Sequence, residues 1–372
     1  MLKIIQALGD FSIESTGNYC DLETRTHEGE TPVFLACKRS ELPCLKYLVE
    51  IGASVRGNQG PAFLKQTPLH AACNLQGTYF NEINSNPDRA EPEEEQWEPS
   101  CSERALPVIQ FLIEGCNMTK NDINAVDTER NTPLMELLYN FQNELASHSV
   151  FQFMSRNVYE GVQYLLCHGA DPTVINSERA TALHIATFSR YLHIKGTWMF
   201  EYNYRTLKEL ILNMTSKYPA AVTKKFINYR DNERRTALQF LLMKNTSKNE
   251  STSEFREKKT DILKLILENG AEPSFGDLQF LFCGDIGLDG LKLFLDNEAL
   301  GLKELLQDGL RKSKRYYRKS DLPAPFLKGM VTSTFSLCHV CLSFIRSANK
   351  RFVRLCLVQC SQGLFEGTYH LP

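Results

Sequence analysis

The sequence predicts an all-α protein in which repeated helix pairs stack into a solenoid. A seven-residue pattern beginning with threonine recurs along the chain, amphipathic stretches follow its copies, and Gly-Ala pairs end several of these stretches. The apolar face of one such pair is too large to leave in water and too small to form a core by itself, so neighbouring pairs must bury it. The composition is that of a globular chain, since 42% of the 372 residues are hydrophobic and 23% are charged.

The best-formed copy of the pattern is TPLHAAC at residues 67–73. Thr67 can cap the free backbone N–H groups of a helix, and Pro68 suits its first position, where the missing N–H costs nothing. An earlier copy, TPVFLAC at 31–37, is followed by an amphipathic stretch and then by Gly52. A glycine there can adopt the left-handed conformation that ends a helix. Each copy therefore predicts one helix pair.

Three further copies begin at Thr132, Thr181 and Thr236, so five helix pairs are expected, with a degenerate sixth at 278–295. The distance between successive copies ranges from 36 to 65 residues, although the pattern persists on either side of each gap. We expect the surplus to form loops on one face of the array, the face that solenoids often use for binding. Inserts without a function are equally expected, because long loops cost little entropy. The inserts are 74–104, 141–157, 188–204 and 244–259.

The seven-residue pattern resembles the ankyrin-repeat signature T-P-L-H-x-A. This resemblance implies an ankyrin-repeat solenoid, with helix pairs and β-hairpin fingers, over residues 26–296, and an N-terminal cap at 1–25. It also implies that His70 and His184, at the fourth place of the pattern, tie adjacent repeats together through hydrogen bonds. Structural rather than catalytic roles are therefore expected for Thr67, Pro68, His70, Thr181 and His184.

The insert at 74–104 directly follows the best-formed repeat and carries an acidic cluster beside a tryptophan. We expect this insert to be the first place where the array contacts a protein substrate, whose identity the sequence does not encode. The residues expected to make this contact are Glu93, Glu94, Glu95 and Trp97.

Charge and motif content exclude several classes of protein. A formal net charge of −2 argues against a general nucleic-acid-binding protein, and no apolar run approaches the roughly 20 residues that a transmembrane helix needs. The N-terminus lacks the pattern of a secretory signal peptide, so we expect a cytoplasmic or nuclear protein whose 12 cysteines are reduced thiols. The motifs of nucleotide-binding proteins, zinc proteases and serine hydrolases are absent, so we expect neither catalysis nor a cofactor.

Residues 297–335 follow the repeats and hold a helical stretch, a basic run at 311–319 and a linker that contains prolines. Basic residues interleaved with tyrosines can bind RNA or act as a nuclear import signal. One short charge run carries little specificity, so we expect a solvated helix face and no nucleic-acid partner.

The segment 336–372 begins with an amphipathic stretch in which Leu337, Cys341 and Ile345 form one stripe, with Phe344 beside it. A stripe with a small sulfur-containing residue at its centre suits docking into a partner's groove. The pattern resembles the Elongin C-binding box that opens a SOCS box. Its four defining places are held by Ser336, Leu337, Cys341 and Ile345.

This box after an ankyrin array and a linker resembles the layout of the ankyrin-repeat and SOCS-box family. The resemblance implies a non-catalytic substrate-recognition subunit of a cullin-RING E3 ubiquitin ligase, in which the repeats hold a protein substrate and the box recruits Elongin C and Elongin B. A cullin scaffold of the cullin-five type is implied as well. The Leu-Pro-x-Pro segment that helps to choose the cullin is absent, however, and LCLV at 355–358 stands in its place. Elongin C binding is therefore better supported than cullin recruitment.

Two other interpretations of the C-terminal segment stay open. In the first, the chain is an ankyrin scaffold without a ligase role, and the stripe lies in the core of a helix that caps the stack. In the second, the cysteines of this segment bind zinc. We expect no metal site, because the first cysteine pair lies in an apolar stretch of helical period, where reduced thiols pack as small hydrophobic groups. The cysteines concerned are Cys338, Cys341, Cys356 and Cys360.

Overall fold

The computed structural model describes residues 21–75, 101–140, 148–187, 197–242 and 253–273, together with Asp277, Gly290, Leu293 and Phe294. The chain divides into two compact units, one of Met1–Leu241 and Asn245–Leu265 and the other of Leu242–Lys244 and Ile266–Pro372.

Five helix pairs are formed by the described residues. The pairs are α2 (Pro32–Lys38) with α3 (Leu42–Glu50), α4 (Pro68–Cys73) with α6 (Cys101–Gln110), α8 (Pro133–Tyr139) with α9 (His148–Cys167), α10 (Ala182–Thr187) with α11 (Thr197–Lys217), and α13 (Ala237–Leu242) with α14 (Ser253–Glu268).

The first helix of each pair begins at the threonine that the sequence pattern singles out. The hydroxyl oxygens of Thr31, Thr67 and Thr132 each accept a hydrogen bond from the backbone N–H three residues later, and a proline follows each threonine. This cap satisfies one of the N–H groups that a helix start leaves without a partner. Glycines of positive φ follow the second helices, with Gly52 at +98° and Gly169 at +101°.

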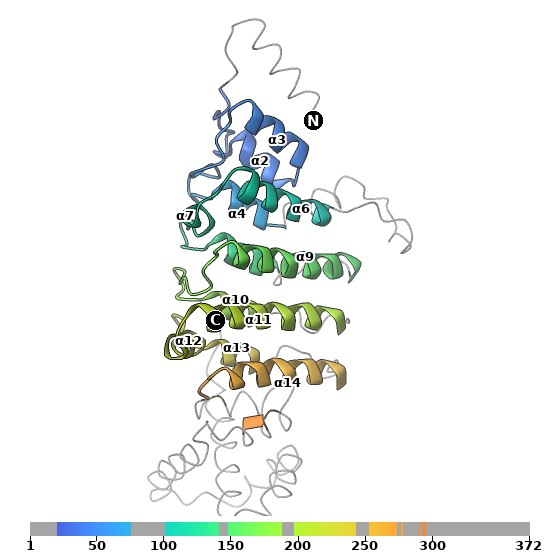
Figure 1. Cartoon of the computed structure of the whole chain (residues 1–372), viewed down its shortest axis with the longest axis vertical. Coiled ribbons are helices and arrows are strands. Elements are labelled where there is room, and N and C mark those ends of the chain that lie inside the picture. The colour runs from blue at the N-terminus through green and yellow to red at the C-terminus, as the bar shows by residue number, and fades with distance from the viewer. Residues whose placement is uncertain are drawn as a thin grey trace, which may run out of the picture. The chain divides into compact units, whose positions relative to one another are not determined.

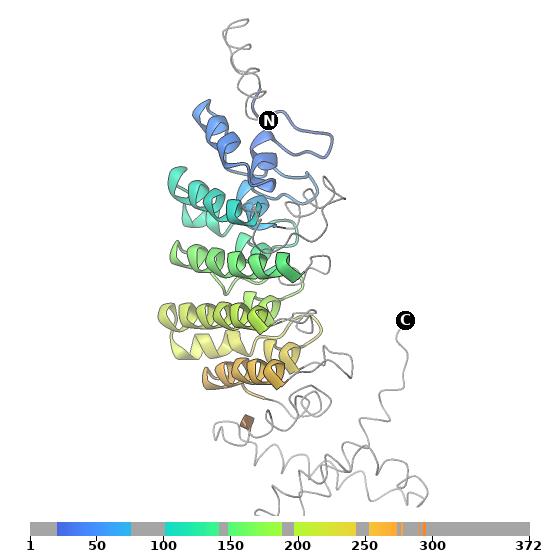
Figure 2. The same ribbon diagram turned by 90° about the vertical axis from the view of Figure 1, so that its right-hand side faces the viewer.

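The helices lie in two layers, which Figure 1 and Figure 2 show from two sides. The first helices α2, α4, α8 and α10 pack in chain order, and so do the second helices α3, α6, α9 and α11. Leucines that point inward from the second helices are almost fully buried, as at Leu45, Leu165 and Leu210. Each pair thus buries its apolar face against its neighbours, as the sequence predicts.

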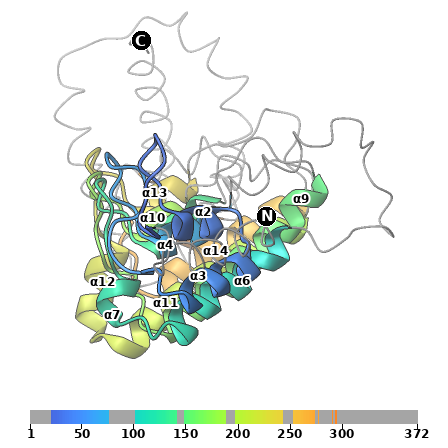
Figure 3. The same ribbon diagram turned by 90° about the horizontal axis from the view of Figure 1, so that it is seen from above.

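A hairpin turn precedes most helix pairs, and we call these turns fingers. The first, third, fourth and fifth fingers are residues 26–30, 127–131, 176–180 and 231–235. In each of these, the N–H of the first residue donates to the carbonyl oxygen of the fifth at 2.9 to 3.1 Å, and the fourth residue has positive φ. The second finger is longer, and its Gln59 N–H donates to the carbonyl oxygen of Gln66 at 2.9 Å. Figure 3 shows the fingers side by side along one edge of the helices.

The fingers differ from the expected β-hairpins, because no residue in the described ranges belongs to a β-strand. A finger of five residues closes a single pair, which is too short for a ladder of paired residues. Neighbouring fingers are nevertheless joined through their backbones. Ser177 N–H donates to the carbonyl oxygen of Glu129 at 2.8 Å, and Asn232 N–H donates to that of Glu178 at 2.9 Å.

Three of the expected inserts contain much less loop than predicted. The second helices α9, α11 and α14 begin inside 141–157, 188–204 and 244–259, and they are 20, 21 and 16 residues long. Polar residues occupy inward positions in the parts of these helices that fall inside the expected inserts, since Asn157, Asn203 and Lys259 are all buried. These residues interrupt the apolar period. The sequence pattern therefore predicts a start for each helix that lies C-terminal to the observed one.

The insert at 74–104 includes the start of α6 at Cys101, and its Leu75 is buried. Two short helices were not expected from the sequence: α7 (Lys120–Ile123) and α12 (Ala220–Ile227), which lie near the fingers in Figure 3.

Helix α6 contains Pro107 and runs into a π-helical turn, Phe111–Gly115. None of the helices described is long and apolar enough to cross a membrane. Free thiols are found at Cys37, Cys44, Cys73, Cys116 and Cys167.

Candidate protein-binding site

The fourth and fifth fingers and the nearby first helices enclose an open cleft of about 580 Å3. Its walls come from three successive repeats: the end of α8, the fourth finger with α10, and the fifth finger with α13. The cleft therefore exists only because these repeats are stacked. The residues that carry its chemistry are Tyr139, Glu178, His184, Asp231, Glu233, Arg235 and Phe240.

Arg235 is the cation in the lining of the cleft, and its own repeat engages it on several sides. Its Nε and Nη2 atoms both lie 2.9 Å from Oδ2 of Asp231, and its Nη1 lies 2.6 Å from Oε2 of Glu233. The guanidinium also lies over the ring of Phe240, 4.5 Å from the ring centroid. The backbone N–H of Arg235 donates to the other carboxylate oxygen of Asp231 at 2.7 Å. These contacts fix Arg235 against the wall of the cleft.

Tyr139 and Glu178 also line the cleft. The hydroxyl oxygen of Tyr139 accepts a hydrogen bond from Nδ2 of Asn176 at 3.2 Å. Burial raises the pKa of Tyr139 to about 12, and the negative charges of Glu178 and Glu136 add to this effect. The phenol therefore stays protonated at neutral pH, so it can donate a hydrogen bond to a ligand as well as present its ring.

The two motif histidines join successive repeats. Nδ1 of His70 accepts from the backbone N–H of Thr67 at 3.2 Å, while its Nε2 lies 3.0 Å from the carbonyl oxygen of Asn131 in the next repeat. His184 repeats this arrangement with Thr181 and with the carbonyl oxygen of Arg235 at 3.2 Å. Nε2 must therefore carry the proton in both rings. Burial lowers the pKa of both histidines, so the rings are held in their neutral form.

A third cross-repeat contact joins the second finger to α8. Nε2 of Gln66 donates to Oε1 of Glu136 at 3.1 Å. Burial, followed by the nearby charge of Asp127, raises the pKa of Glu136 to about 7. This carboxyl group thus changes its charge close to neutral pH, on the same side of the array as the cleft.

Most of the functional residues expected from the sequence lie outside the described residues. They comprise the insert residues Glu93, Glu94, Glu95 and Trp97 and the box residues Ser336, Leu337, Cys341, Phe344 and Ile345. The basic run at 311–319 and the cysteines of the C-terminal segment are also outside them. In the described residues, no group of three or more His, Cys, Asp or Glu side chains could hold a metal ion.

The sequence contains a signal for the cleft in its turns rather than in its helical pattern. The fingers carry the related sequences DTER at 127–130, NSER at 176–179 and DNER at 231–234, which place a glutamate and an arginine at each tip. The repeated turn sequence therefore locates these tips. It carries no sign of Tyr139 or Phe240, because these residues reach the cleft only through the stacking of neighbouring repeats.

No family model matches this sequence, and no curated protein matches it. A similar solved structure is an ankyrin repeat domain from Acinetobacter baumannii, which is 19% identical. The similarity covers 72% of this chain and 97% of that one, with a TM-score of 0.41. The structure itself shows Thr-capped first helices, hairpin fingers and stacked helix pairs, an arrangement that agrees with the turn and two helices of an ankyrin repeat.

Proposed function

We propose that this chain is a non-catalytic protein-recognition subunit whose ankyrin-type array binds a partner through its fingers and first helices. The cleft of about 580 Å3 carries this proposal, because three successive repeats line it and its two fingers present exposed carboxylates, Glu178 and Glu233. Both nitrogens of His70 and His184 are engaged in holding repeats together, so these rings support structure rather than proton transfer. The insert residues Glu93, Glu94, Glu95 and Trp97 are a second proposed contact with the same partner.

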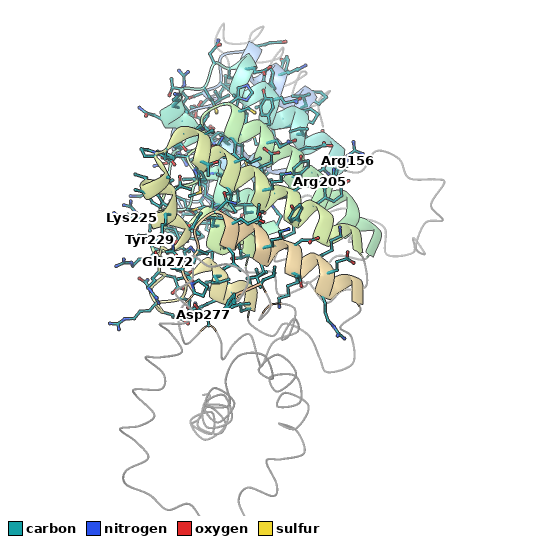
Figure 4. All side chains as sticks on the ribbon, turned by 60° about the horizontal axis from the view of Figure 1, so that its bottom comes forward. Arg156, Arg205, Lys225, Tyr229, Glu272 and Asp277 are labelled. Carbon is teal, nitrogen blue, oxygen red and sulfur yellow. The ribbon has the colours of Figure 1, made fainter. Side chains whose placement is uncertain are left out.

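A photo-crosslinking residue tests which side of the array meets the partner. We expect p-benzoylphenylalanine in place of Arg234, at the exposed tip of the fifth finger, to give crosslinks to a partner protein in cells. The same residue in place of Arg156 is the matched control, because Arg156 is exposed on the second helix α9, away from the finger edge marked by Tyr229 in Figure 4. Crosslinks from position 156 in preference to 234 would refute the proposed binding face.

The same recognition function fits a larger assembly. We propose that the box at Leu337, Cys341 and Ile345 binds Elongin C, and through it Elongin B and a cullin scaffold, so that the chain presents its partner for ubiquitination. The support is the four-place pattern and its position after the array and the linker. Tethering would raise the effective concentration of the partner's lysines near the ubiquitin-loaded enzyme, without any catalytic group in this chain.

Co-expression with Elongin B and Elongin C tests this assembly. The full chain is expected to retain Elongin C, while Leu337→Ala with Cys341→Ala weakens retention by about tenfold or more, as loss of buried anchor side chains does. The measurement is pull-down of the full chain followed by quantitation of bound Elongin C. His339→Ala with Ser343→Ala is the matched control, because these positions lie off the stripe.

The outcomes separate the ligase proposal from its main alternative. If the unaltered chain retains no Elongin C, the ligase proposal is wrong and the ankyrin scaffold without a ligase role is favoured. If the stripe variant and the control variant bind equally well, the contact lies elsewhere in the chain.

A further inference from the structure

We propose that the cleft between the fourth and fifth fingers binds a cationic side chain, an arginine or a lysine, of the partner protein. This inference rests on the proposed recognition function and adds the chemistry of what is recognised. It arises from a charge imbalance in the cleft and from one carboxylate that the neighbouring repeats leave without a partner.

The charges that line the cleft do not cancel. Glu178, Asp231 and Glu233 supply three negative charges, whereas Arg235 supplies one positive charge. His184 adds none, because burial lowers its pKa and holds the ring neutral. Two negative charges are therefore left in a site with aromatic side chains, an environment that favours a cation and disfavours an acidic group.

Glu178 is the carboxylate that is left over. Among the residues described, no hydrogen bond or ion pair engages its side chain, although the same place in the third finger is satisfied: Oε2 of Glu129 accepts from the hydroxyl of Ser177 at 2.6 Å. The residue in position to serve Glu178 is Asn232. Its Nδ2 instead donates to the backbone carbonyl of Ser177 at 3.1 Å. Asn232 holds in the fifth finger the place that Ser177 holds in the fourth. Because Asn232 binds a backbone carbonyl instead of a glutamate, the Glu178 carboxylate is left available.

The nearest arginine in the chain is directed to another contact. Arg179 follows Glu178, but its Nη2 lies 3.2 Å from the hydroxyl of Tyr229 and its guanidinium lies over that ring, 5.5 Å from the centroid. Arg179 is not among the residues that line the cleft. An incoming cation can therefore meet Glu178 on one side and Tyr139 on another, combining an ion pair with a cation–π contact.

The lining itself provides the reporters for a test. Ala180 and Ile185 both line the cleft, so their methyl groups can be labelled and followed by NMR in the full chain. The probe is the tripeptide Ac-Gly-Arg-Gly-NH2, compared with its lysine and citrulline counterparts. We expect the arginine and lysine probes to shift both methyl signals with a dissociation constant on the order of 10 mM, since one partly exposed ion pair binds weakly. Citrulline, which lacks the charge, should give no saturable shift.

Two variants locate the contact. Glu178→Gln is expected to weaken binding of the arginine probe by about fivefold. Glu129→Gln, which changes the matching finger outside the cleft, should leave the binding unchanged. The inference is overturned if citrulline binds as well as arginine, if both variants act alike, or if no probe shifts the two methyl signals at about 50 mM. Any of these results can occur while position 234 still crosslinks to a partner, so failure of this inference is distinct from failure of the recognition function.

Discussion

Replacement of Asn140 by leucine is expected to lower the free energy of unfolding by about 3 kcal/mol. Asn140 ends α8 and reaches back to the preceding repeat: its Oδ1 accepts from Leu75 N–H at 3.0 Å, and its Nδ2 donates to the carbonyl oxygen of Cys73 at 2.8 Å. Both partners are buried, with Leu75 1% and Cys73 0% exposed. Leucine has a similar size but leaves these backbone groups without hydrogen bonds in a site that water does not reach.

The measurement is urea unfolding of the full chain, compared with that of Asn121→Leu. Asn121 is exposed on α7, so its replacement should change the free energy of unfolding by no more than about 0.5 kcal/mol. Equal effects of the two substitutions would show that the contacts of Asn140 contribute nothing specific to the second and third repeats.

Replacement of His70 by leucine is expected to cost about 2 kcal/mol of stability. The imidazole is completely buried and spans two repeats, from Thr67 to the carbonyl oxygen of Asn131. That carbonyl also accepts from Asp127 N–H at 3.0 Å, so it keeps one partner after the substitution. The expected loss is therefore smaller than at Asn140.

Position 135 supplies the control, because Met135 holds the place of His70 in the third repeat and is also buried. Met135→Leu conserves volume and removes no hydrogen bond, so its cost should stay below about 1.5 kcal/mol. Thermal unfolding of both variants, followed by circular dichroism, measures the difference. A His70→Leu chain as stable as Met135→Leu would mean that packing alone, rather than the hydrogen bond, joins these repeats.

The helix pairs could be predicted because their starts are encoded locally. A threonine cap and a following proline act within one turn of helix, and they occur together at Thr31, Thr67 and Thr132. The lengths of the second helices could not be predicted in this way. Lys259 is 0% exposed although it is charged, and a residue of this kind in a sequence indicates solvent rather than a core.

The cleft depends on contacts between residues that lie far apart in the sequence. Whether Glu178 is free is decided by Asn232, which lies in the next finger and directs its amide to a backbone carbonyl. The sequence alone does not distinguish this arrangement from the serine–glutamate hydrogen bond of the third finger. Tyr139 enters the same cleft from an earlier repeat. Such relations between repeats appear only when the pairs are stacked.

The hydrogen bonds between neighbouring fingers have a consequence for how this array can diversify. They run from backbone to backbone, as from Ser177 N–H to the carbonyl oxygen of Glu129 and from Asn232 N–H to that of Glu178. The spacing of the tips is therefore set by groups that every residue except proline possesses. Exchange of a tip side chain therefore leaves the spacing of the fingers unchanged, while it can engage or release a carboxylate on the neighbouring finger, as Ser177 and Asn232 do.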